Sequence, residues 1–110
     1  MAMQNLGNTY ESLGKYVEAE KIQSKVLDLR KKQLGEEHPD TIGVMGSLAV
    51  TYQSLGKYAD AEKLQSLVLD LRNKDLGKEH PETIGTMSNL ASTHDHLGKH
   101  TDAERLKLKF

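Results

Sequence analysis

Five histidines are the residues whose type and spacing most readily suggest chemistry in this chain, because a neutral imidazole is a common metal ligand. His94, His96 and His100 lie close together in the stretch "HDHLGKH". Residues two apart on a helix point to different faces, so this spacing does not bring His94 and His96 to one ion. A metal site is therefore the less favoured interpretation. We predict instead that His94 and His100 replace tyrosines in the last copy of a repeated pattern.

The other two histidines, His38 and His80, each stand directly before a proline. A residue in that position is pushed towards extended backbone geometry, which suits the residue that caps the start of a helix. We predict that both are caps in turns.

Catalysis has no recognisable basis in the sequence. No serine, histidine and aspartate arrangement can be read from it, and the absence of cysteine excludes a thiol nucleophile, a thiolate metal site and a disulfide framework. No glycine motif for phosphates occurs. We predict that the protein is not an enzyme, that it needs no cofactor, and that it has no catalytic, cofactor-binding or metal-binding residues.

The charge balance limits the partners. Lys and Arg number 15 and Asp and Glu number 16, and no long block of one sign occurs. A general attraction to nucleic acid or to a membrane surface is therefore not expected. No apolar run approaches the roughly 18 residues of a membrane span, and the first residues do not form a signal peptide. We predict a cytoplasmic protein with a protein or peptide partner.

An internal repeat organises the chain. The phrase "LGKYVEAEK" at 13–21 returns as "LGKYADAEK" at 55–63 and as "LGKHTDAER" at 97–105, always 42 residues later. Residues 5–46 and 47–88 are identical at 28 of 42 positions without a gap. Residues 89–110 match the first part of the unit. We therefore predict one array over 1–110, made of units 5–46 and 47–88 and a partial unit 89–110.

Each unit has the pattern of two helices. Ile42, Met45, Ala49 and Tyr52 fall on one helical face, after a proline suited to the first helical position and before Gly56. A second apolar face follows in the same unit, and no segment alternates with the period of a strand. We expect helices at 1–13, 16–34, 39–55, 58–76, 81–97 and 101–109. Short links make neighbouring helices antiparallel, so the predicted fold is an all-α, right-handed superhelical solenoid of helix hairpins.

The stretch "NLGNTYESLGKYVEAE" resembles the tetratricopeptide repeat. The matching positions are Leu6, Gly7, Tyr10, Gly14, Tyr16 and Ala19. The 42-residue period is similar to that of the kinesin-light-chain type. The resemblance implies that small residues such as Ala49 and Ala61 face each other where the helices of a hairpin approach closely.

The resemblance also implies a binding surface on the concave side, formed by the first helix of each unit. The residues at these places are Gln4, Asn8, Glu11, Gly46, Val50, Gln53, Ser88, Ser92 and Asp95. A carboxylate clamp like that of some family members is not expected. Only Asn8 fits among its places, which are Gln4, Asn8, Ser47, Gly85 and Asn89, and none of them is a cation.

A structural role is the alternative to partner binding. Neither end of the array has a polar capping unit that the sequence identifies, so we expect association through the ends. Head-to-tail stacking is slightly favoured over a two-fold dimer, and a swapped third hairpin is a further alternative.

Overall fold

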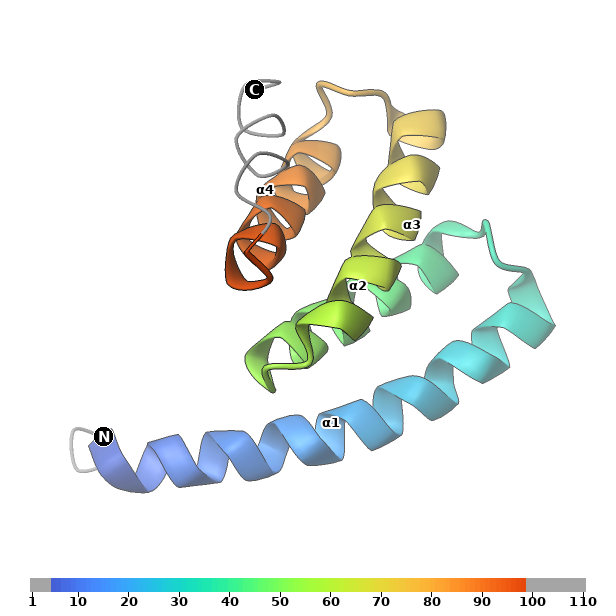
Figure 1. Cartoon of the computed structure of the whole chain (residues 1–110). Helices are drawn as coiled ribbons and strands as arrows, with labels where there is room; N and C mark the ends of the chain where they lie inside the picture. The colour runs from blue at the N-terminus through green and yellow to red at the C-terminus, as the bar shows by residue number, and fades with distance from the viewer. Residues whose placement is uncertain (1–4, 99–110) are drawn as a thin grey trace.

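The computed structural model describes the backbone of residues 5–98 and the side chains of residues 14–98. In this part of the chain there are four helices and no strand: α1 (Asn5–Leu34), α2 (Pro39–Ser54), α3 (Tyr58–Leu76) and α4 (Pro81–His96). Each helix packs against the next one along the chain, and α2 also approaches α4 (Figure 1). The predicted all-α solenoid is confirmed.

The helix boundaries agree with those expected from the sequence after residue 38 and differ before it. The helices expected at 39–55, 58–76 and 81–97 are confirmed to within one residue at each end. The break expected between 13 and 16 is wrong, because α1 runs without interruption from Asn5 to Leu34. The helix expected at 101–109 lies outside the described residues.

Gly14 shows why α1 does not break. Gly56 closes the turn between α2 and α3 with φ +79°, and the following N–H of Lys57 donates to the carbonyl of Tyr52 at 2.8 Å. Gly14 has no positive φ, and a Cβ built on it would meet no atom within 4 Å. A Cβ built on Gly56 would also meet no atom within 4 Å, so it is the backbone conformation that distinguishes the two glycines, and α1 continues through Gly14 as one helix.

The two histidines that precede prolines are helix caps, as predicted. The Nδ1 of His38 accepts a hydrogen bond from the N–H of Asp40, and the Nδ1 of His80 accepts one from Glu82, both at 3.1 Å. Each histidine has extended backbone, and the proline after it occupies the first helical position. The caps satisfy a donor that the first helical turn leaves free.

The core lies where α2 is enclosed by α1 and α3. Its buried side chains are Leu27, Ile42, Met45, Leu48, Val68 and Leu71. Ala49 and Ala61 are completely buried, as expected of small residues where helices approach closely. Among the described residues, no helix is long and apolar enough to cross a membrane.

Candidate binding groove

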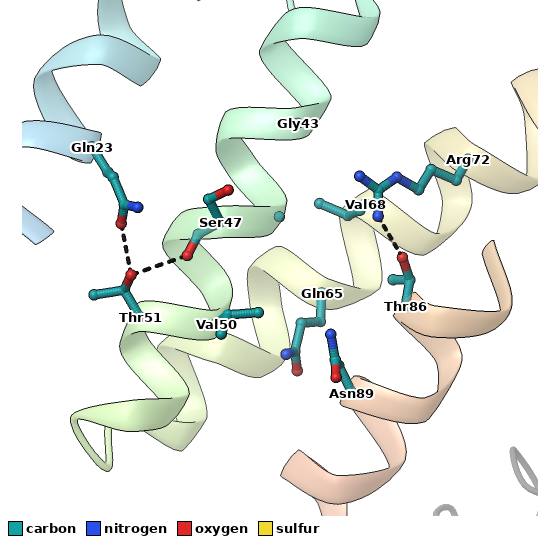
Figure 2. Close-up of a pocket in the computed structure, with 11 residues that line it drawn as sticks. Gln23, Gly43, Ser47, Val50, Thr51, Gln65, Val68, Arg72, Thr86 and Asn89 are labelled. Carbon is teal, nitrogen blue, oxygen red and sulfur yellow. Dashed lines mark hydrogen bonds between the residues drawn. The ribbon is translucent and has the colours of Figure 1, made fainter. Parts of the chain in front are cut away.

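A groove lies between the first helices of the second and third units, with α3 as its floor. It has a volume of about 450 Å3. Figure 2 shows α2 on one side and α4 on the other, with side chains of α3 between them. The residues that line it are Gln23, Gly43, Gly46, Ser47, Val50, Thr51, Gln65, Val68, Arg72, Thr86 and Asn89.

The residues predicted for the concave surface are only partly gathered here. Gly46 and Val50 line the groove, and Val50 is 43% exposed. Gln53 borders it, because its amide donates to the backbone carbonyl of Asn89 at 3.5 Å. Ser88, Ser92 and Asp95 follow on α4 but do not line this hollow. The others are Asn8 and Glu11, whose side chains lie outside the described part of the chain, and Gln4, which lies outside it altogether.

A repeated hydrogen bond fixes the floor of the groove. The hydroxyl of Thr51 on α2 lies 2.7 Å from Oε1 of Gln23 on α1, and one period later the hydroxyl of Thr93 lies 2.6 Å from Oε1 of Gln65. Each bond joins the second helix of one unit to the first helix of the next. The amide of Gln65 also donates to Oε1 of Gln53 at 3.3 Å, so the glutamines link α2, α3 and α4.

Arg72 brings a positive charge into the groove. Its Nη1 donates to the hydroxyl of Thr86 at 2.8 Å, and its Nη2 lies 3.9 Å from a carboxylate oxygen of Glu82. The side chain is 19% exposed. A Cβ added to Gly46 would lie 3.5 Å from Nη2, which is an ordinary van der Waals contact, so Gly46 lies directly beside the guanidinium.

Sequence reasoning missed Arg72 because it considered the first helices alone. The prediction that the clamp places hold no cation remains true of those places, but the groove itself receives one from the second helix. Position 46 is glycine where the other copies have Gln4 and Ser88, but a Cβ there would make only an ordinary contact with Arg72, so this difference was no signal of the arginine. Arg30, one period before Arg72, lines an adjoining hollow together with Asp40.

The histidine cluster joins helices to each other. The Nε2 of His94 lies 2.9 Å from a carboxylate oxygen of Glu62 on α3. The ring of His96 stacks on Tyr58 with 4.4 Å between ring centres. His100 lies outside the described residues. Within residues 14–98 no three side chains of the kinds that bind metals come together. These two imidazoles therefore serve the packing of α4 on α3.

An ion pair fastens the α2–α3 turn to α1. The ammonium of Lys57 lies 2.8 Å from a carboxylate oxygen of Glu20. The hydrogen bond to Glu20 raises the pKa of Lys57, and the nearby negative charge acts in the same direction. The pair sits on the surface, away from the groove.

Comparison with known proteins identifies the family. A family model described as "Tetratricopeptide repeat" matches residues 1–72 and 43–109. The chain is 51% identical over 43 residues to a nucleotide-binding leucine-rich repeat (NLR)-like protein of Hyaloscypha variabilis, a match that covers 39% of the chain and 4% of that protein.

Solved structures agree over almost the whole chain. The nearly identical TPR-like repeats of a Podosopora anserina protein assigned as a kinesin light chain superpose with a TM-score of 0.83 at 27% identity, covering 98% of this chain and 51% of that one. A second crystal structure of those repeats gives 0.83 at 26% identity, with the same coverage. The chain thus spans about half the length of the solved arrays. It belongs to the tetratricopeptide repeat family, and its 42-residue units are of the kinesin-light-chain-like type.

Proposed function

We propose that the chain is a non-enzymatic scaffold that binds an extended peptide segment of a partner protein in the groove between α2 and α4. Tetratricopeptide repeats generally mediate contacts between proteins. The observation that carries the proposal is the groove itself, which runs between the first helices of two units and is lined by both polar and apolar groups. The proposal includes one array over 1–110, cytoplasmic localisation, and no nucleic acid or membrane partner.

The groove chemistry suits a peptide main chain. The exposed residues Ser47 and Asn89 place a hydroxyl and an amide group along it, and such groups can pair with the N–H and C=O groups of an extended segment. The exposed side chain of Val50 offers an apolar contact. Arg72, held by Thr86, favours a segment that carries a carboxylate.

A peptide-display selection against the whole chain tests this proposal. A selected peptide should bind Val50→Glu at least about tenfold more weakly, because the change puts a charge on the apolar wall. The melting temperature should not change, since Val50 is 43% exposed. Lys63→Ala is the matched control, because Lys63 is exposed on α3 and borders a different hollow.

Two results would contradict the proposal that a peptide binds in this groove. Loss of binding in Lys63→Ala with full binding in Val50→Glu would move the site to the other face of the array. A selection that yields no peptide would count against peptide binding as the function of the groove.

A self-associating array is the second candidate. It is favoured by the exposed apolar side chains of α1, which include Ile22 and Leu29.

A further inference from the structure

A second, smaller hollow adjoins the groove where α2 and α4 begin and α3 ends. This end hollow has a volume of about 130 Å3. It shares Gly43 of α2 and Arg72 of α3 with the groove, so the two spaces meet at these residues. A segment that lies in the groove therefore passes the mouth of the end hollow.

The walls of the end hollow are apolar. Pro39 and Ile42 come from the first turn of α2, and Leu76 is the last residue of α3. Ile42 is only 4% exposed, whereas Leu76 is 41% exposed and offers an uncovered apolar side chain. An apolar cavity of about 150 Å3 takes up one benzene molecule, so the end hollow has room for the stem of one side chain.

The rim of the end hollow carries more negative than positive charge. Its charged residues are Asp75, Glu82 and Arg72. The guanidinium of Arg72 is held by Thr86 and lies 3.9 Å from a carboxylate oxygen of Glu82, so it offsets that carboxylate only in part. Asp75 is exposed and has no hydrogen-bond or ion-pair partner among the described residues. The rim therefore attracts a cation.

We propose that the end hollow takes up a lysine side chain of the segment that binds in the groove, an inference that rests on the proposed function. The methylene stem of the lysine packs on Ile42 and Leu76, and its ammonium lies at the carboxylates of Asp75 and Glu82. A lysine combines these two requirements, because its stem covers apolar surface while its charge stays in water. A purely aliphatic side chain leaves the carboxylates without a counter-charge, and an acidic side chain is repelled by them.

Peptides selected by display from a random library against the whole chain are the probes of the first test. They should share a lysine at one position, and its replacement by norleucine, which keeps the stem without the charge, should weaken binding about fivefold. In Asp75→Gln this difference should fall to about twofold or less. The variant introduces the residue that the first unit has at this place, Gln33. Asp70→Gln is the matched control, because Asp70 is exposed on α3 but does not line the end hollow.

The outcomes separate this inference from the proposed function. Peptides that bind without any preferred lysine, or equal binding of the lysine and norleucine peptides, would overturn the lysine site and leave peptide binding in the groove intact. Selected peptides that bind Val50→Glu as tightly as the unchanged chain would instead refute the groove, and the lysine site with it.

Substitution of Gly43 tests whether the groove and the end hollow are used together. A Cβ built on Gly43 would meet no atom within 4 Å, so Gly43→Leu adds a side chain where the two spaces meet. The melting temperature should not fall, since leucine is the better helix former, but the selected peptide should bind about tenfold more weakly. Gly85→Leu is the matched control: Gly85 holds the same place one period later, has equal space, and lines neither hollow. Equal binding by the two variants would overturn the proposal.

An exchange of charges tests the contact between the lysine and Asp75 directly. Asp75→Lys should bind the lysine peptide more weakly than the unchanged chain does. It should prefer a peptide in which glutamate replaces that lysine, because the two charges have then changed places. A merely structural effect of the substitution would weaken both peptides alike. If Asp75→Lys still prefers the lysine peptide as strongly as the unchanged chain does, the ammonium does not lie at Asp75 and the proposal is wrong.

Discussion

Replacing Thr93 by valine should destabilise the fold more than the same replacement at Thr51, although the two threonines hold equivalent places in successive units. Each hydroxyl bonds to a glutamine on the preceding helix, at 2.6 Å for Thr93 and Gln65 and at 2.7 Å for Thr51 and Gln23. Valine keeps the shape of the side chain and removes the donor. The difference between the two sites is therefore the environment of the acceptor.

The burial of each glutamine determines how much stability the threonine replacement costs. Gln65 is 2% exposed, so no water can replace the lost hydroxyl, and an unsatisfied buried acceptor costs about 1–3 kcal/mol. Gln23 is partly exposed, so water can take the place of Thr51, and the loss is the smaller net value of about 0.5–1 kcal/mol. With a shift of about 4–8 °C per kcal/mol, Thr93→Val should lower the melting temperature by about 4–24 °C.

Thermal and urea unfolding followed by circular dichroism measure both losses. The double variant Gln65→Leu/Thr93→Val should lose less than the sum of the single changes, because removing both partners leaves no orphaned acceptor at this bond. Equal losses for Thr51→Val and Thr93→Val, or a larger loss at Thr51, would refute the argument from burial. Strict additivity in the double variant would show that the two side chains do not interact.

Two further predictions concern packing and charge. Ala61→Leu should lower the free energy of unfolding by about 1–3 kcal/mol, because Ala61 is completely buried. Ala59→Leu should change stability little, because Ala59 is exposed. Equal shifts of the melting temperature would mean that the close helix contact does not lie at Ala61. The hydrogen bond that Lys57 donates to Glu20 raises the pKa of Lys57, so the pair stabilises the fold below the ordinary lysine pKa and is lost as the pH rises through the raised value. Lys57→Met should therefore make the melting temperature less dependent on pH in the alkaline range, and an unchanged alkaline decline would count against the pair.

Local signals made the second unit predictable. His80 and the proline after it mark a helix start within a few residues, and Gly77 and Gly98 mark ends through a positive φ. Each signal acts through the backbone groups of its own turn, so it needs no information from the rest of the fold. The helices that begin and end with such signals were placed to within one residue.

The continuity of α1 at Gly14 could not be predicted from the local residues, because "LGKY" is identical at 13–16 and 55–58. The four residues alone therefore do not decide between a helix and a turn. Arg72 was missed for a related reason. Its long side chain acts at a distance from its own helix, beside Gly46 of α2 and Thr86 of α4. Assigning residues to one face of a helix does not show that a long side chain extends to a neighbouring helix.

The hydrogen bonds under the groove are the same in successive units, whereas the residues of its walls differ. The hydrogen-bonded floor repeats without change, since Gln23 and Thr51 recur as Gln65 and Thr93. The walls differ at the equivalent places: Val50 becomes Ser92, and Gly46 becomes Ser88. The guanidinium of Arg72 lies beside Gly46 of one wall and donates to Thr86 of the other, so the charge of the groove lies between the two walls. Replacement of wall residues can thus change what a groove binds while the bonds that hold successive units together stay intact.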